Sequence, residues 1–266
     1  MIMKPLAIDL FCGLGGWTDG LLEEGYDVIG FDITQHVYGD MRYPAQLVLQ
    51  DVLTLHGSQF KSADLIVASP PCQEYSYMAM PWKLAKAKAA AIRADTTGQK
   101  LEALNRLFNA CFRIQREACE AAGRHIPMVV ENVRGAQEWV GRARWNYGSF
   151  YLWGDIPALM PPAFKAVKVP SFRFDGSGRS FQTASVRRTN QGNGARFTSR
   201  DCGIEADGIK NGNDWFGSGE NASLQRRHGS KSSGRKMASA MIAKIPVPLG
   251  RFIASTYRPH PAEAAA

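Results

Sequence analysis

The sequence Leu6-Ala-Ile-Asp-Leu-Phe-Cys-Gly-Leu-Gly-Gly16 decides the fold of this chain. Its first half is a short apolar run, which predicts a buried strand over Leu6 to Phe11. Its second half is rich in glycine, which lets the backbone turn tightly and approach a ligand without interference from a Cβ. A helix predicted over Trp17 to Glu24 and a strand over Asp27 to Asp32 follow, so the stretch predicts the first unit of a doubly wound α/β sheet.

The alternation of strands and helices continues through the first half of the chain. Further strands are predicted over Leu47 to Val52, Asp64 to Ala68 and Pro127 to Glu131, and an amphipathic helix over Lys100 to Ala122. The basic stretch from Tyr75 to Gln99 has two interpretations, a mobile loop or an ordinary surface helix.

Composition limits the classes of protein to consider. The 266 residues are 45% hydrophobic, enough for one large core with a small appended lobe. There is no apolar run of about 18 residues and no signal-peptide pattern at the N-terminus, so we expect a cytoplasmic protein with no membrane contact. Five cysteines without a Cys-x-x-Cys pair predict reduced thiols and no metal site.

Positive charge is concentrated in one segment. The net charge is +8, and residues 160–236 hold 14 Lys and Arg against 6 Asp and Glu, so this segment carries the whole excess. Such a distribution is typical of a lobe that faces nucleic acid, although a solvated basic surface is the alternative. We therefore expect a body over 1–159, a basic lobe over 160–236, a C-terminal segment over 237–258 that returns to the body, and a disordered tail over 259–266.

Two short motifs follow predicted strands and bring reactive groups. Pro71-Cys72-Gln73 supplies a thiol, and Glu131-Asn132-Val133 supplies a carboxyl group that is costly to bury without a partner. Ligands of open α/β sheets bind at the carboxyl ends of the strands. The sequence therefore predicts a reaction site at this edge, near the glycine-rich turn, whereas Cys12, Cys111, Cys119 and Cys202 are interpreted as small buried hydrophobes.

These three motifs, in this order, resemble those of the DNA cytosine-5 methyltransferases. The resemblance covers about the first 155 residues and a short piece near the C-terminus. It implies a Rossmann-like, S-adenosylmethionine-dependent methyltransferase with a mostly parallel sheet and a small irregular basic lobe that recognises the target. It also implies double-stranded DNA as the partner of a protein that we expect to be monomeric.

The resemblance implies a donor site on the glycine turn and the next strand ends. Asp32, about twenty residues after the glycines, is placed to accept hydrogen bonds from a ribose, which by itself fits NAD as well as S-adenosylmethionine. Asp51 is expected to contact the adenine, with a plain turn carboxylate as the alternative. The residues expected to bind the donor are Phe11, Cys12, Gly13, Leu14, Gly15, Gly16, Asp32, Ile33, Asp51, Val52 and Pro71.

The family's chemistry assigns the remaining residues. Cys72 is expected to add to carbon 6 of cytosine, and Glu131 to stabilise the ring at nitrogen 3. The resemblance makes Arg142 and Arg144 catalytic, with a phosphate contact as the rival role of Arg142. The residues expected to contact the substrate are Ser69, Gln73, Asn132 and Val133, and a weaker set in the basic lobe is Gln182, Arg187, Arg188 and Gln191.

Two motifs depart from the family pattern. Val140 stands at the glutamine position of Gln-x-Arg-x-Arg, and the strand after the arginines is predicted at Phe150 to Trp153. The last motif, Ala243-Lys-Ile-Pro-Val-Pro-Leu249, lacks the Gly-Asn pair, and Lys244 replaces a small residue. We expect this segment to pack back on the body as a helix.

The expected function is methyl transfer from S-adenosylmethionine to carbon 5 of a flipped cytosine in DNA, through a covalent cysteine adduct. The alternatives are a catalytically silent nucleic-acid-binding module of the same fold and an RNA cytosine-5 methyltransferase. A nucleotide-dependent oxidoreductase is also compatible with the glycine turn, but it leaves Pro71-Cys72-Gln73 without a role.

Overall fold

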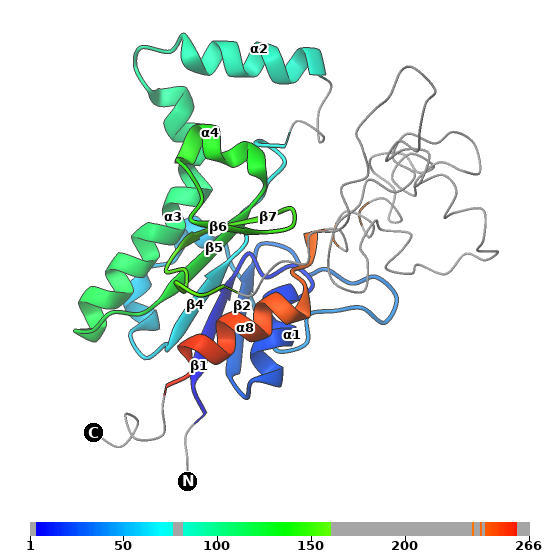
Figure 1. Cartoon of the computed structure of the whole chain (residues 1–266), viewed down its shortest axis with the longest axis vertical. Coiled ribbons are helices and arrows are strands. Elements are labelled where there is room, and N and C mark those ends of the chain that lie inside the picture. Colours follow the sequence, from blue (N-terminus) through cyan, green and yellow to red (C-terminus); the bar gives the residue numbers. More distant parts are fainter. Residues whose placement is uncertain (1–3, 77–81, 161–235, 237–239, 241–242, 260–266) are drawn as a thin grey trace, which may run out of the picture.

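The computed structural model describes residues 4–76, 82–160, 236, 240 and 243–259 (Figure 1). Within these residues the strands form one seven-stranded sheet of order β3-β2-β1-β4-β5-β7-β6. The strands are β1 (Leu6–Leu10), β2 (Asp27–Asp32), β3 (Gln46–Leu49), β4 (Leu65–Ala68), β5 (Met128–Asn132), β6 (Trp145–Tyr147) and β7 (Phe150–Gly154). The α-helices are α1 (Gly16–Glu23), α2 (Trp82–Arg93), α3 (Gln99–Ala122), α4 (Gln137–Val140) and α8 (Val247–Tyr257).

The first five strands pair in parallel, and the last two are added antiparallel. β3, β2, β1, β4 and β5 run side by side in one direction. β7 pairs antiparallel with β5, and β6 closes a hairpin with β7. The fold is therefore α/β with a mostly parallel sheet, which confirms the fold class predicted from the sequence.

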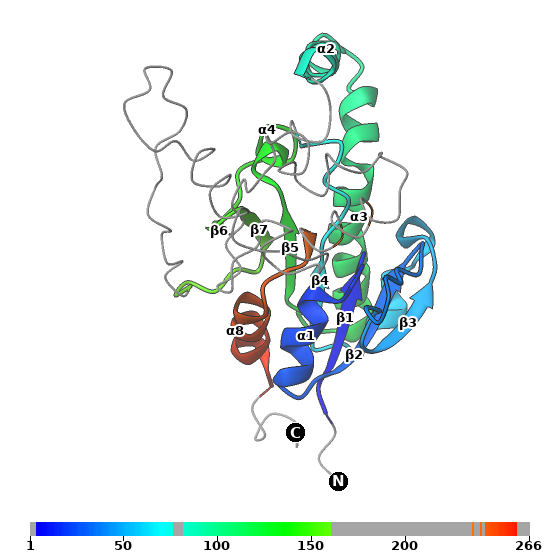
Figure 2. The ribbon, with the colours of Figure 1, turned by 90° about the vertical axis from the view of Figure 1, so that its right-hand side faces the viewer.

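Helices cover both faces of the sheet, α3 on one side and α1 with α8 on the other (Figure 2). Successive strand residues alternate between the two layers: Ile66 packs in the α3 core, and Leu65 packs in the α1/α8 core. All four residues of β4 are buried. Burial on both faces explains why the central strands are continuous apolar runs without a polar alternation.

The C-terminal helix α8 packs against the helix α1. A Cβ on Gly20 would lie 2.5 Å from the backbone N of Arg251. Tyr26, directly before β2, donates a hydrogen bond from its hydroxyl to the carbonyl of Ala254 at 3.0 Å. The missing side chain at Gly20 is thus what allows the two helix backbones to approach each other.

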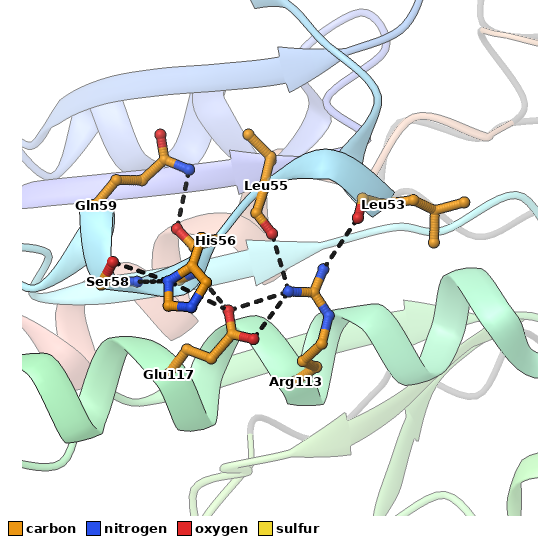
Figure 3. Close-up of polar contacts among 8 residues, drawn as sticks. Leu53, Leu55, His56, Ser58, Gln59, Arg113 and Glu117 are labelled. Atoms are coloured by element: carbon orange, nitrogen blue, oxygen red, sulfur yellow. Dashed lines mark hydrogen bonds and ion pairs between the residues drawn. The ribbon is translucent and has the colours of Figure 1, made fainter.

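A polar cluster holds the segment after β3 against α3 (Figure 3). Arg113 donates to the carbonyls of Leu55 and Leu53 at 2.9 and 3.4 Å and pairs with Glu117 at 3.0 Å. Glu117 also accepts a hydrogen bond from the backbone N of Gly57 at 2.6 Å. The cluster fixes the two 3-10 helices η1 (Val52–Thr54) and η2 (Gly57–Phe60), and therefore the position of the residues just before them.

Some predicted elements differ from the observed ones. The strand predicted to run to Val52 ends at Leu49, because Asp51 accepts a hydrogen bond from the backbone N of Leu53 and caps η1. The strand predicted to start at Phe150 after the arginines is preceded by β6, which starts at Trp145. The stretch with two interpretations contains the helix α2.

Most of the predicted basic lobe lies outside the described residues. This applies to Gln182, Arg187, Arg188, Gln191 and Cys202, and to the tail from residue 260. The division of the chain at residues 159 and 236 therefore stays a prediction.

Candidate active site

The thiol motif follows β4 at the carboxyl edge of the sheet. Ser69 closes the strand with a backbone hydrogen bond to Leu10 at 3.1 Å, and its Oγ accepts one from the indole N–H of Trp17 at 3.0 Å. The carbonyl of Cys72 accepts from the backbone N of Tyr75 and Ser76 at 3.0 and 2.9 Å, so Cys72 begins a tight turn. Cys72 is partly exposed, so solvent or a substrate can reach this turn.

The acid motif ends the neighbouring strand β5. Glu131 is 7% exposed and Asn132 is 1% exposed. Asn132 donates from Nδ2 to the carbonyl of Pro70 at 2.9 Å, and its Oδ1 accepts from the backbone N of Val133 at 2.8 Å. One amide side chain therefore joins the acid motif to the loop that carries Cys72, although the two are far apart in the sequence.

Arg142 and Arg144 are exposed and lie at the start of the β6–β7 hairpin. The backbone N of Arg144 donates to the carbonyl of Leu152 at 2.9 Å. The register places Trp145, Leu152 and Glu131 in one row across the sheet. The Arg-x-Arg pair is thus two strands from Glu131, next to a strand that the sequence analysis missed because this run of three residues is too short to show alternation.

Gln137 contacts the segment between Arg142 and Arg144, which its position in the sequence did not indicate. Its Oε1 accepts a hydrogen bond from the backbone N of Ala143, between the two arginines, at 3.2 Å. Val140, at the expected glutamine position, is partly buried against the α3 core. A glutamine side chain therefore does reach this segment, from three residues upstream of the expected position.

The glycine turn between β1 and α1 has a strained, open backbone. Phe11 has a positive φ of 57°, which a residue with a side chain rarely adopts. Gly13 also has a positive φ, and a Cβ there would meet no atom within 4 Å. Gly15, with φ 76°, precedes the first turn of α1. The turn leaves free space beside Gly13, which fits the predicted approach of a ligand to the backbone.

Asp32 and Ile33 lie at the end of β2 beside this turn. Asp32 accepts hydrogen bonds from the backbone N of Gly13 on Oδ2 and of Thr34 on Oδ1, both at 3.0 Å. Each carboxylate oxygen keeps a lone pair for a further donor, such as a ribose hydroxyl. Ile33 is 73% exposed, so its side chain is available to a ligand.

The other residues predicted to bind the methyl donor differ in how much of their side chain is exposed to a ligand. Leu14 is 5% exposed and Val52 is 2% exposed, so their side chains have little surface for a ligand. Burial, followed by the charges of Asp9 and Asp32, raises the pKa of Cys12, which therefore remains a thiol. Pro71 and Gln73 are exposed on the Cys72 loop.

A buried polar network under the turn was not foreseen. Thr18 donates from Oγ1 to Oδ2 of Asp9 at 2.6 Å, and its Oγ1 lies 2.7 Å from the hydroxyl of Tyr43. The ring of Tyr43 fills the space left by Gly30, where a Cβ would overlap it. An aspartate inside an apolar strand was the available signal, but its partners come from elements that only the fold brings together.

A groove opens beside the Cys72 loop, between α2 and α3. Its volume is about 490 Å³, and Pro71 and Tyr75 line one side of it. Its cationic residues are Lys88, Lys100 and Arg106. α2 is held over this region by an ion pair of Lys88 with Glu74 and by Arg93, which pairs with Glu138 and stacks 5.7 Å from the ring centroid of Trp139.

In the described part of the chain, no group of three or more His, Cys, Asp or Glu side chains could hold a metal ion. No helix among these residues is both long and apolar enough to cross a membrane.

Comparison with known proteins gives a family match over part of the chain. Residues 6–89 match the family model described as C-5 cytosine-specific DNA methylase. The match covers β1, the glycine turn and the Cys72 loop, which carry two of the three motifs used above. Among the curated proteins, none matches the chain.

Similar solved structures include methyltransferases. A DNA modification methyltransferase encoded within a prophage of E. coli is 25% identical over 50% of this chain and 33% of that chain, with a TM-score of 0.33. The Entamoeba histolytica methyltransferase EhMeth is 18% identical over 52% of this chain and 41% of that chain, with a TM-score of 0.34. The S. pombe Dnmt2 methyltransferase is 11% identical over 95% and 98% of the two chains, with a TM-score of 0.41.

The chain spans 33% and 41% of the lengths of the first two of these structures. The family resemblance recognised from the sequence motifs is confirmed by the family model, which ends at residue 89. The similarity to the C-5 cytosine-specific DNA methylase family therefore extends over residues 6–89.

Proposed function

We propose that this chain is a DNA cytosine-5 methyltransferase, which moves a methyl group from S-adenosylmethionine to carbon 5 of a cytosine extruded from duplex DNA. One observation carries the proposal. The hydrogen bond from Asn132 to the carbonyl of Pro70 holds the loop of the partly exposed Cys72 against the strand end that carries the nearly buried Glu131. A nucleophile and an acid on opposite sides of one ring is what this reaction requires.

The proposed role of Cys72 is to add to carbon 6 of the cytosine. Carbon 5 is too weakly nucleophilic to take a methyl group unaided, and the new sulfur–carbon bond turns the ring into an enamine. Glu131 donates a proton or hydrogen bond to nitrogen 3, which absorbs the electron density displaced by the thiolate. Carbon 5 then takes the methyl group, and S-adenosylhomocysteine is the leaving group. Water accepts the proton of carbon 5 as the double bond between carbons 5 and 6 re-forms and the bond to Cys72 breaks.

The residues around the glycine turn fit the methyl donor. Open space beside Gly13 admits a ligand close to the backbone, Asp32 keeps free lone pairs for ribose hydroxyls, and Ile33 offers an exposed apolar side chain to a base. When bound, S-adenosylmethionine supplies an electrophilic methyl group on a positively charged sulfur. Asp51, fixed by the cap of η1 and by the α3 cluster, is the proposed contact of the adenine amine.

Other residues of the same edge are assigned to the substrate. Ser69, Gln73 and Val133 flank the two motifs and are proposed to line the cytosine pocket. Arg142 and Arg144 are proposed to contact the extruded nucleotide. Extrusion costs about a few kcal/mol, which contacts to the DNA backbone must offset, and the basic segment 160–236 is the proposed source of these contacts.

The test is transfer of a labelled methyl group to cytosine-containing duplex DNA, with single-stranded RNA and transfer RNA as parallel substrates. Cys72→Ser is expected to lose all detectable transfer while it still binds S-adenosylhomocysteine. Cys119→Ser is the matched control, because Cys119 lies on α3 and its sulfur accepts a hydrogen bond from Ile126 that a hydroxyl can also accept. Transfer only to RNA would replace DNA by RNA as the substrate.

A second measurement tests the covalent step. A duplex that carries 5-fluorocytosine lacks the proton that must leave carbon 5, so the adduct should be trapped on Cys72 and found by mass spectrometry. Active enzyme without such an adduct, or Cys72→Ser with normal turnover, would refute the proposed role of Cys72.

A further inference from the structure

The last motif of the chain lies directly on the glycine turn. A Cβ on Gly16 would overlap the backbone N of Ile245 and lie 3.0 Å from Cγ of Lys244. Ile245 is 3% exposed, so this contact is part of the core. The segment that departs from the family pattern at Lys244 is therefore seated on the turn that is proposed to hold the donor.

Lys244 forms an ion pair across this contact. Its Nζ lies 2.7 Å from Oδ2 of Asp19, in the first turn of α1. The backbone N of Asp19 donates to the carbonyl of Gly15 at 2.9 Å, so its carboxylate is anchored one helical turn after the glycines. The two side chains are 29% and 28% exposed, which leaves both charges within reach of a ligand from solvent.

Charges of both signs lie around the glycine turn, and a zwitterion needs both to bind. Burial raises the pKa of the carboxyl group of Asp9, and the charges of Asp32 and Asp19 raise it further, so both carboxylates act on the site under the turn. Lys244 adds a positive charge to this acidic surrounding. A partly exposed ion pair can open to bind a ligand that carries one positive and one negative group. Each protein charge is then paired both before and after the ligand binds.

We propose that Lys244 and Asp19 bind the amino-acid end of the methyl donor, the ammonium of Lys244 pairing with its α-carboxylate and the carboxylate of Asp19 pairing with its α-ammonium. The proposal rests on the proposed function and adds one specificity-determining pair to it. It also gives Lys244 a role at the position where the family pattern has a small residue.

The two ligands that test the proposal are S-adenosylhomocysteine, which has the amino-acid end, and 5′-methylthioadenosine, which lacks it. Binding of each is measured by calorimetry, without turnover. Lys244→Met should weaken S-adenosylhomocysteine by about 10- to 100-fold, the usual effect of losing a hydrogen bond to a charged group. The same variant should bind 5′-methylthioadenosine as the unaltered protein does, and Lys244→Arg should retain most of the affinity for both.

Arg251→Met is the matched control. Arg251 pairs with Glu23 and Glu24 at 3.3 Å, so it also joins α8 to α1, and both of its partners lie at the C-terminal end of α1, away from the turn. This variant should change the binding of neither ligand. If Lys244→Met lost the same affinity for both ligands, or lost none, the inference would be overturned. The ion pair would then only join the two segments structurally. If the unaltered protein bound neither ligand, the proposed function would fail and the inference with it.

Discussion

At the scale of single residues, the fold changes the acid–base chemistry of Asp9. It is 1% exposed, Thr18 donates to its Oδ2, and its Oδ1 has no hydrogen-bond partner. Burial raises the pKa of Asp9 to about 7, the hydrogen bond from Thr18 opposes this, and the charges of Asp32 and Asp19 add to it. The folded protein therefore binds a proton at Asp9 that the unfolded chain releases at lower pH.

The consequence is a dependence of stability on pH with an unusual sign. Because the pKa of Asp9 rises on folding from 3.8 to about 7, its protonated form stabilises the fold at low pH. This contribution is lost as the pH rises through that interval, with a slope of up to about 1.4 kcal/mol per pH unit for one proton. Asp9→Asn cannot ionise and should lack that slope.

The measurement is urea unfolding of both proteins between pH 4 and pH 8. The free energy of unfolding of Asp9→Asn, relative to the unaltered protein, should increase steadily up to about pH 7 and then level off. Asparagine places an amide where Oδ1 is unpartnered, so a constant offset is expected and only the change with pH is diagnostic. A difference that stays constant over this range would mean that Asp9 is already ionised in the fold.

Single-residue roles were predictable where one element settles them. Cys72 and Glu131 follow apolar runs, and the ends of parallel strands meet at one edge, so their common location could be inferred. The contacts of Asp9 with Thr18 and Tyr43 could not, because they join a strand, a helix and a loop whose distances depend on the whole packing. The ion pair of Lys244 with Asp19 joins residues from opposite ends of the chain, and no spacing rule reaches that far.

At the scale of elements, the packing of α8 on α1 depends on Gly20. In an isolated helix Gly→Ala is stabilising by about 1 kcal/mol. Here the added Cβ would lie 2.5 Å from the backbone of Gly250 and Arg251, which cannot move as a side-chain end can. Gly20→Ala should therefore destabilise the protein by about 1 to 3 kcal/mol, the usual cost of overpacking.

Thermal or urea unfolding checks this sign. Glu120→Ala, at an exposed position of the helix α3, controls for helix propensity and should lie within about 0.5 kcal/mol of the unaltered protein. If Gly20→Ala were more stable than the unaltered protein, α8 could move away from α1 without a loss of stability. The position of Lys244 beside the glycine turn would then not depend on this packing.

Elements were predictable in proportion to their length and periodicity. The prediction for α3 differs from the observed helix by one residue at the start and by none at the end. A long amphipathic stripe with a glycine on either side leaves few alternatives. β6 has three residues, two of them exposed, and shows neither an apolar run nor alternation. It forms because β7 offers an unpaired edge beside it, which is a tertiary cause.

At the scale of the whole molecule, charge and chemistry are separated along the chain. The residues outside 160–236 hold 18 cations and 18 carboxylates, so the part that carries Cys72 and Glu131 is neutral in sum. The architecture of this part could be predicted from the order of its motifs. The excess of positive charge predicts a polyanionic partner, but the sequence of bases that it would read depends on side-chain positions in three dimensions.

Binding of DNA should accordingly weaken with salt, in proportion to the number of phosphates that cations of the basic segment contact. The logarithm of the affinity falls with the logarithm of salt concentration by about 0.9 for each contacted phosphate. Replacing Arg187 and Arg188 by alanine should reduce this slope by up to about two such units, as measured by fluorescence anisotropy with a labelled duplex. Lys4→Ala with Lys61→Ala removes the same charge just before β1 and β4, at the amino ends of the strands, and should leave the slope unchanged. Equal losses in the two double variants would show that net charge alone attracts the DNA, and the assignment of the segment 160–236 as the DNA-binding lobe would be wrong.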